Sequence, residues 1–206
     1  MRLSTLQRAS LEEATVRYAA SVGPAVEYLK GRGLSGAQAD TFRLGYVDSP
    51  MLGDEDYAGR LAIPYITLTG VVDIRYRAIT DTPGPKYMSR PGTVTRLYNV
   101  TATTLPTSNI AITEGEFDTM IAQGVCGIPS VGVPGANNWK DHFRLLFSDY
   151  DRVFVLCDGD QAGREFGKKL GRELDNSVVV HLPDGHDVNS LYLAEGRAAV
   201  RALVGL

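Results

Sequence analysis

The chain has few of the features that mark secreted, membrane-spanning or zinc-binding proteins. Only two of its 206 residues are cysteine, and Cys126 and Cys157 both lie within apolar runs, where a buried free thiol is the expected state. Neither has another Cys or His at zinc-ligand spacing, so we expect no zinc site in this chain. No apolar stretch approaches the about 20 residues that a membrane-spanning helix needs. The first twenty residues include Glu12 and Glu13 and no continuous apolar segment, which argues against a signal peptide. We therefore expect a cytoplasmic protein with no membrane association.

Charge is unevenly distributed along the chain. The net charge is only −3, yet residues 58–108 carry six basic and two acidic residues, whereas residues 109–206 carry nine basic and fourteen acidic ones. A basic segment beside an acidic one suits a protein that holds a polyanion with one part and a divalent metal with the other. A chance fluctuation of composition explains this uneven charge equally well. The charge alone therefore does not indicate a binding function, and the sequence motifs are needed to distinguish the two explanations.

The first half of the chain is predicted to be helical and then β-rich. In residues 1–57, Ser10 is expected to cap the first helix and Ser35 a later one. Residues 58–108 contain two stretches rich in β-branched and aromatic residues, joined by a Thr-Gly turn, which predict a hairpin. The period of two along a strand places Arg75 and Arg77 on the same face of that hairpin.

From residue 109 to residue 206, short apolar strands alternate with helical segments. Such alternation predicts a parallel sheet covered by helices. We therefore expect an α/β domain over residues 109–206, preceded by a small mixed α+β part: a helical segment, 1–57, and a basic β-rich subdomain, 58–108.

Acidic residues follow three of the predicted strands at the point where each strand ends: Glu114 and Asp118, then Asp158 and Asp160, then Asp184 and Asp187. Ligands of open α/β sheets bind outside the carboxyl ends of the strands, so the three clusters should meet at one rim. Oxygen ligands in such numbers suit Mg²⁺ or Mn²⁺, and carboxylates held together without a cation repel one another. Acids also cap helix N-termini, and Asp118 or Asp160 taken alone would more often be a cap than a ligand.

The segments EGEFD, residues 114–118, and DGDQAG, residues 158–163, resemble the two signatures of the Toprim family. Bacterial-type primases, type IA and type II topoisomerases and certain nucleases share these signatures. In that family the first-motif Glu acts as a general acid or base, or as a ligand, and the second-motif aspartates bind divalent metal. The resemblance implies a catalytic set of Glu114, Asp118, Asp158 and Asp160. It implies as metal ligands Glu114, Asp158, Asp160 and Asp187.

Segments before the acidic motifs narrow the resemblance to the catalytic core of a bacterial or phage DnaG-like DNA primase. The helical entry of that core is similar to AVEYLKGRGLS and FRLGYV, and its strand pair is similar to GRLAIPYITLTGVVDIRYRAI. Its basic loop is similar to GPKYMSRPG, and its third acidic motif is similar to LPDGHDVNSL. Topoisomerases and Toprim nucleases are not expected to share the first hundred residues. The residues implied to bind nucleic acid or NTP are Lys86, Arg77, Arg75 and Arg96. Lys86 is alternatively an ordinary exposed lysine, and Arg75 and Arg77 could instead pair with Asp73 or Asp81.

The chain also departs from the primase pattern. It lacks the usual N-terminal zinc-binding module and the C-terminal helical and helicase-binding regions, and Asn189 replaces a second carboxylate of the third motif, which implies weaker metal binding there. The stretch between Lys86 and Tyr98 is shorter than usual, so Arg96 is only a substitute for the family's basic residue.

The resemblance implies template-directed synthesis of RNA primers from NTPs on single-stranded DNA, using Mg²⁺ or Mn²⁺. The resemblance implies as further partners a replicative helicase and a zinc-binding module supplied in trans. The compact form suggests a phage or mobile-element protein, or an excised fragment. Two alternatives stay open: a Toprim metal-dependent nuclease, and a non-catalytic DNA-binding accessory protein.

Overall fold

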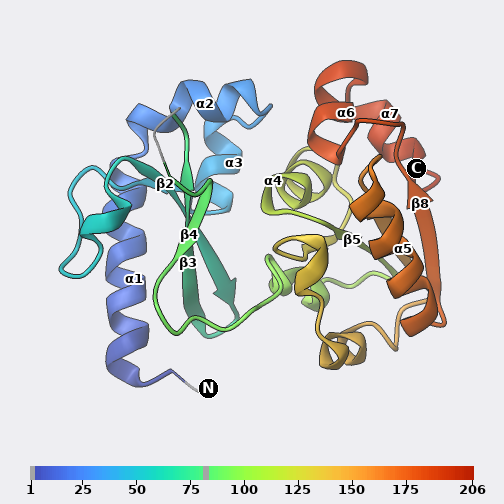
Figure 1. Cartoon of the computed structure of the whole chain (residues 1–206), viewed down its shortest axis with the longest axis horizontal. Coiled ribbons are helices and arrows are strands. Elements are labelled where there is room, and N and C mark those ends of the chain that lie inside the picture. Colours follow the sequence, from blue (N-terminus) through green and yellow to red (C-terminus); the bar gives the residue numbers. More distant parts are fainter. Residues whose placement is uncertain (1–2, 81–83) are drawn as a thin grey trace. The chain divides into compact units, whose positions relative to one another are not determined.

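A computed structural model of the chain describes residues 3–80 and 84–206 (Figure 1). The chain divides into two compact units, Met1–Val94 and Thr95–Leu206. The boundary differs from the predicted ones, after residues 57 and 108, for reasons of packing. The N-terminal helices share a hydrophobic core with the first sheet, while Leu97 and Ala102 belong to the core of the second unit.

The first unit consists of N-terminal helices and an antiparallel sheet of order β1-β2-β3-β4. The helices are α1 (Thr5–Ala20), α2 (Val26–Gly31) and α3 (Gly36–Thr41), with 3-10 turns at Gly23–Ala25 and Glu55–Tyr57. The strands are β1 (Gly45–Tyr46), β2 (Arg60–Thr67), β3 (Gly70–Ala78) and β4 (Tyr87–Ser89). The predicted hairpin is therefore confirmed as β2 and β3, whereas the short strands β1 and β4 were not predicted.

Helix α1 begins earlier than the sequence suggests. Ser4, not Ser10, is its N-cap: the Ser4 hydroxyl accepts a hydrogen bond from the Gln7 backbone N–H, and the Gln7 side chain accepts one from the Ser4 N–H. This reciprocal capping box satisfies two helix-end donors, so it is preferred to the cap at Ser10. The predicted cap at Ser35 is correct, and helix α3 follows it directly.

The second unit is a parallel sheet of order β6-β5-β7-β8 with helical connections. Its strands are β5 (Asn109–Thr113), β6 (Ser130–Gly132), β7 (Arg152–Cys157) and β8 (Ser177–His181). Its α-helices are α4 (Glu116–Thr119), α5 (Gln161–Glu173), α6 (Val188–Glu195) and α7 (Arg197–Ala202). A π-helical turn at Met120–Val125 extends α4, and 3-10 turns occur at Val100–Thr104, Ala136–Asn138 and Asp141–Leu146. The predicted α/β class and the preceding mixed α+β part are confirmed.

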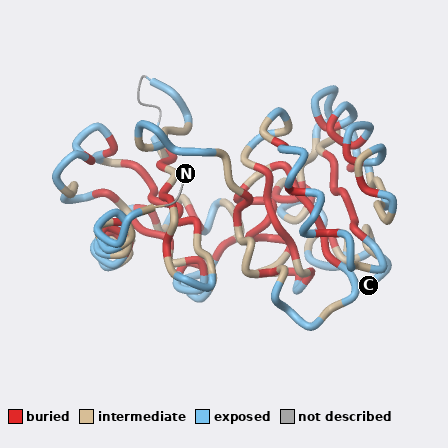
Figure 2. Tube along the Cα trace, turned by 90° about the horizontal axis from the view of Figure 1, so that it is seen from below, coloured by how far each residue is buried: buried red, intermediate tan, exposed pale blue. Residues whose placement is uncertain are grey.

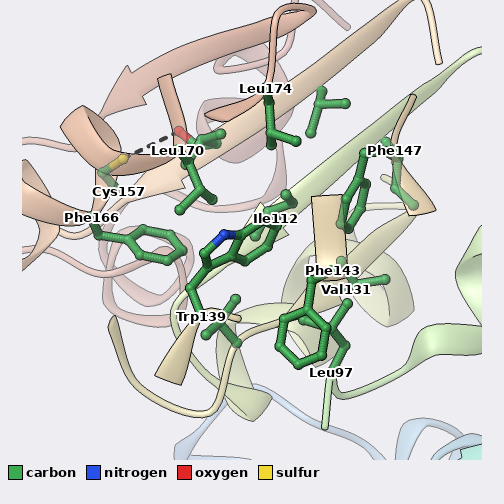
Figure 3. Close-up of a cluster of buried hydrophobic side chains, with 14 of the residues drawn as sticks. Leu97, Ile112, Val131, Trp139, Phe143, Phe147, Cys157, Phe166, Leu170 and Leu174 are labelled. Atoms are coloured by element: carbon green, nitrogen blue, oxygen red, sulfur yellow. Dashed lines mark hydrogen bonds between the residues drawn. The ribbon is translucent and has the colours of Figure 1, made fainter. Parts of the chain in front are cut away.

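Aromatic and aliphatic side chains fill the core of the second unit (Figure 3). Trp139 lies against Phe143 and Phe147, with ring centroids 5.7 and 5.9 Å away. Its indole N–H donates to Glu173 at 2.6 Å, so the polar edge of the ring is satisfied. This packing holds α5 and the neighbouring connections on the sheet, and thereby fixes the loops at the strand ends.

Buried residues are concentrated inside each unit, and most exposed ones lie on helices and loops (Figure 2). Within residues 3–80 and 84–206, no helix has both the length and the apolar character needed to cross a bilayer.

Candidate metal centre

Three neighbouring strands of the parallel sheet deliver acidic residues to one rim. The order β5-β7-β8 is continuous and all three strands are parallel, so their carboxyl ends point the same way. Glu114 follows β5, Asp158 follows β7, and Asp187 lies in the loop after β8. This is the rim at which open α/β sheets bind their ligands.

A direct hydrogen bond joins the first two motifs. The backbone N–H of Asp158 donates to the Glu114 carboxylate at 2.9 Å, and Glu114 is only 9% exposed. Burial raises the pKa of Glu114 to about 7, a rise that the charge of Asp160 reinforces and the bond from Asp158 opposes. Glu114 therefore changes protonation near neutral pH, as suits a group that exchanges protons.

Backbone contacts at Gly159 hold the second motif against the third. The Gly159 N–H donates to the His186 carbonyl at 2.8 Å, and the Gly185 N–H donates to the Gly159 carbonyl at 3.0 Å. A Cβ at Gly159 would lie 2.0 Å from the Pro183 carbonyl oxygen, a distance that no side chain tolerates. Glycine is therefore required where the two acidic loops meet.

Two of the predicted site residues also cap helices. Asp160 precedes α5 and accepts a hydrogen bond from the Gly163 N–H at 2.8 Å. Asp187 precedes α6 and accepts one from the Ser190 N–H at 2.6 Å. The capping role weighed from the sequence is thus real at Asp160, whereas the cap at Asp187 was not predicted. Each cap uses one carboxylate oxygen and orients the side chain at the rim.

Asp118 is bonded to the start of helix α6. Its carboxylate accepts a hydrogen bond from the Asn189 backbone N–H at 3.0 Å, and its side chain is buried. Burial, followed by the charge of Asp187, raises the pKa of Asp118 to about 7. Asn189, which replaces the expected carboxylate, is itself 1% exposed and acts on Asp118 through its main chain.

Asp158 is the least compensated of these carboxylates. Its Oδ1 atom is buried and has no hydrogen-bond partner among the described residues. Burial raises its pKa to about 8, and the charges of four other carboxylates contribute to the rise: Asp118, Glu114, Asp187 and Asp160. Five of the six predicted acidic residues thus interact electrostatically, and we call them the carboxylate rim: Glu114, Asp118, Asp158, Asp160 and Asp187. The sixth, Asp184, is exposed and lies 3.7 Å from Arg164.

The carboxylate rim fits a divalent cation. Its donors are all oxygens, and the unpartnered Oδ1 of Asp158 lacks the positive charge that would stabilise it. Among the described residues, no three Asp, Glu, His or Cys side chains converge into a ready-made cage. Mg²⁺ does not require one, because it is usually bound through one or two carboxylates, with waters and substrate phosphates completing its shell.

Glu116 is a rim neighbour to which the sequence assigned no role. It lies between Glu114 and Asp118 in the first motif, yet it is 1% exposed. Its charge adds to burial in raising the pKa of Tyr98, so the Glu116 carboxylate lies near that ring. Tyr98 pairs with Gly132 through its backbone, which ties the segment before β5 to the sheet. The extra acid in the motif was visible in the sequence, but its burial was not.

The predicted phosphate-binding arginines of the first unit lie in an alternating stack with tyrosines. The Arg77 guanidinium donates to the hydroxyls of Tyr28, at 2.5 Å, and of Tyr87. Arg75 and Arg77 lie 4.1 and 4.9 Å from the centre of the Tyr87 ring, and Arg32 lies 5.6 Å from that of Tyr28. Cation–π contacts of this kind preorganise guanidinium groups.

The remaining predicted binding residues differ in their exposure. Lys86 is exposed and precedes β4. Arg96 belongs to the second unit, where its Nε is buried without a hydrogen-bond partner among the described residues. Asp81, weighed as a partner for the arginines, lies outside the described residues.

Comparison with known proteins agrees with this geometry. A family model described as Toprim-like matches residues 111–192, which include all three acidic motifs. Gene 57 protein of Mycobacterium phage D29 is 48% identical over 149 residues, covering 70% of this chain and 97% of that protein. The chain belongs to the Toprim family.

More distant relatives specify the branch of the family. The DNA primase of Pseudomonas putida is 28% identical over 230 residues, which cover 87% of this chain but 34% of the primase. The chain thus spans about a third of that primase's length. The RNA polymerase domain of Mycobacterium tuberculosis primase DnaG, solved in complex with double-stranded DNA, superposes with a TM-score of 0.80 at 23% identity, covering 98% of this chain and 80% of that one. The fold of this Toprim protein is that of a DnaG-type primase catalytic core.

Proposed function

We propose that this Toprim protein is the catalytic core of a DNA primase, which synthesises RNA primers from NTPs on a single-stranded DNA template with Mg²⁺ or Mn²⁺. The observation that carries the proposal is the buried Oδ1 of Asp158, which has no hydrogen-bond partner among the described residues and lies in a cluster of five carboxylates. Such a cluster is unfavourable by itself and becomes favourable with a bound cation. The relationship to DNA primases supplies the reaction class.

Each rim residue has a distinct role in the proposed reaction. Asp158, Asp160 and Asp187 would hold the cation, which supplies Lewis-acid stabilisation of charge on the phosphoryl oxygens. Glu114, with a pKa of about 7, is suited to take the proton of the attacking 3′-hydroxyl, or to serve as a further ligand. Asp118 is buried and bonded to the start of α6, so it supports the geometry of the rim.

The basic residues would bind the phosphates of the nucleotide and the template. Lys86 and Arg75 are accessible in the first unit, and Arg77 holds the tyrosines beside them. Arg96 would contribute from the second unit. Fixed cations stabilise phosphoryl charge most effectively when they are in place before the reaction. A role in DNA replication would place the protein in the cytoplasm.

One assay distinguishes primase activity from the alternatives. The protein is incubated with labelled single-stranded template, labelled NTPs and Mg²⁺ or Mn²⁺, and both labels are followed. We expect NTP label in short RNA products, abolished in Asp158→Asn and retained in Asp151→Asn. Asp151 is exposed at the opposite end of β7, so it makes a matched control. Template cleavage would indicate a nuclease, and binding without either product would indicate an accessory protein.

A second comparison concerns partners in trans. Without zinc ligands at suitable spacing, this core should extend a supplied dinucleotide better than it initiates. Adding a zinc-binding module or a replicative helicase should increase initiation more than extension. Efficient unaided initiation at a defined sequence would contradict the need for the zinc module.

A further inference from the structure

Helix α5 presents a row of basic side chains in an otherwise acidic unit. Residues 109–206 contain nine basic residues, and four of them lie within nine positions of this helix: Arg164, Lys168, Lys169 and Arg172. A spacing of four places Arg164, Lys168 and Arg172 along one helical face, and all three are exposed. We call these three residues the α5 ridge.

Most of the ridge charge is not compensated within the fold. Arg164 lies 3.7 Å from the exposed Asp184 and donates to Gln161 at 3.4 Å. Within the part of the chain that the structure describes, neither Lys168 nor Arg172 has a side-chain hydrogen bond or ion pair.

The acidic side chains of α5 are hydrogen-bonded to residues outside the α5 ridge. Glu165 accepts a hydrogen bond from Gln161 at 2.9 Å, and Glu173 accepts one from the Trp139 indole at 2.6 Å. A surface helix stabilised by its own ion pairs would show Glu–Lys partners instead. The ridge charge is therefore available to an external partner.

The ridge is attached rigidly to the carboxylate rim. Asp160, a rim residue, is the N-cap of α5, so the helix leads away from the rim. Its opposite face packs on β7 and β8. Figure 1 shows α5 beside β8. A Cβ at Gly167 would lie 2.7 Å from the Cys157 sulfur. At 1.5 Å per residue, Arg164 and Arg172 are separated by about 12 Å along the axis.

We infer that the α5 ridge binds the sugar–phosphate backbone of the nucleic acid as it extends away from the carboxylate rim, an inference that rests on the proposed function. A row of exposed cations fits the repeating charge of a polyanion. The acidic character of the rest of the unit would confine the strand to this helix. The same chemistry serves a single-stranded template or a template–primer hybrid.

The test uses the full chain with Lys168→Ala/Arg172→Ala and a control of equal charge loss, Arg144→Ala/Arg152→Ala. Alanine favours helix, so α5 should persist, which circular dichroism verifies. Arg144 and Arg152 are exposed in the same unit but outside α5, and Arg152 begins β7 at the end opposite the rim. Fluorescence anisotropy with labelled single-stranded DNA and with an RNA–DNA hybrid is recorded over a range of salt concentrations.

Two lost phosphate contacts should weaken binding roughly 10-fold near 0.1 M salt and reduce the salt slope on single strands by about 1.4. The control pair should change neither quantity. A loss confined to one probe identifies which nucleic acid follows the ridge. Equal losses in both double variants, or an unchanged slope in the ridge variant, would overturn the inference.

Binding is measured without NTPs, so this result is independent of primer synthesis. A chain that binds through the ridge and makes no primer would contradict the proposed function alone. If the wild-type chain makes primers and the ridge variant keeps the wild-type salt slope, only the inference about the α5 ridge is contradicted.

Discussion

Each unit of this protein contains an aspartate with a buried carboxylate oxygen, and the two oxygens differ in their hydrogen-bond partners. Asp54, in the first unit, is 1% exposed and accepts hydrogen bonds from the hydroxyls of Tyr18, at 2.6 Å, and Tyr76, at 3.1 Å. Arg90 pairs with both of its oxygens, at 2.8 and 2.5 Å. Asp158, in the second unit, has a buried oxygen without a partner among the described residues and four carboxylates that raise its pKa.

The difference is that one carboxylate is fully paired within the fold and the other is not. Burial of a charge is costly unless the charge is paired and hydrogen-bonded, and Asp54 meets both conditions. Its bonds connect α1, the loop before β2 and the segment after β4. Burial and the bond to Asp54 also raise the pKa of Tyr18 to about 12, so that hydroxyl remains a donor. Among the described residues, the buried oxygen of Asp158 meets neither condition, as expected if the proposed cation is its partner.

Removing the paired aspartate should have the largest effect. Asp54→Ala leaves the part-buried Arg90 without its counter-charge, and breaking such a pair typically costs about 3–5 kcal/mol of the free energy of unfolding. Urea denaturation followed by circular dichroism measures the loss. Asp56→Ala is the control, because Asp56 is exposed and its removal should change stability by less than about 0.5 kcal/mol. Equal stability of the two variants would show that the network is not structural.

Changing a rim carboxylate should impair the reaction and leave the fold intact. Glu114→Gln should lower primer extension by about 100-fold or more, the usual contribution of a general base. Since the pKa of Glu114 is raised to about 7, the wild-type rate should rise through neutral pH, and the variant should lose that rise. Steady-state extension rates from pH 6 to 9 test this, with Glu165→Gln as an exposed control. A proportional loss at every pH would assign Glu114 to binding alone.

The rim should also make stability depend on pH in the metal-free protein. The folded-state pKa values of Glu114 and Asp118, about 7, and of Asp158, about 8, exceed the unfolded values of about 4. Between these limits the folded protein holds protons that the unfolded chain has lost. The free energy of unfolding therefore falls as pH rises from about 4 to about 8 and is level above that.

A divalent cation should restore the stability that is lost as pH rises, and most strongly at pH values at which the carboxylates are ionised. At tenfold excess over its dissociation constant, Mg²⁺ should add about 1.4 kcal/mol to stability. Thermal unfolding at pH 8.5 should show a larger rise on adding Mg²⁺ than at pH 6, and Asp158→Asn should reduce that difference. Asp151→Asn should behave as wild type. An equal Mg²⁺ effect at both pH values would argue against a site built from these groups.

The parts predicted correctly from the sequence are those with strong local patterns. Strands β5, β7 and β8 are apolar runs that alternate with helical segments, so the parallel sheet follows from the order of residues alone. The second motif also contains Gly159, which lies against the third acidic loop.

The parts that were missed depend on long-range contacts. The pair Asp54–Arg90 joins residues 36 positions apart and belongs to no motif. Strands β1 and β4 contain too few residues to show a period of two. Leu97 looks like part of the β-rich subdomain in sequence, but its packing in the second core decides its unit. The burial of Glu116 likewise follows from packing, and the presence of a charged residue in a motif does not indicate whether that residue is buried.

The smallest expected effect is that of removing Lys86, an exposed cation, and it is compared with the effect of removing Arg77, a buried one. Lys86 is exposed, so Lys86→Ala should leave the free energy of unfolding unchanged within about 0.5 kcal/mol. If it contacts one phosphate, the salt slope of single-strand binding should decrease by about 0.7.

Arg77 is 5% exposed and bonded to Tyr28 and Tyr87. Arg77→Ala should therefore lower the free energy of unfolding by about 1–3 kcal/mol, because it removes the donor to both hydroxyls. Salt titrations and urea denaturation of both variants separate the two roles. An unchanged salt slope in Lys86→Ala would make it an ordinary surface lysine, and the arginine–tyrosine stack would then carry the phosphate contacts of the first unit.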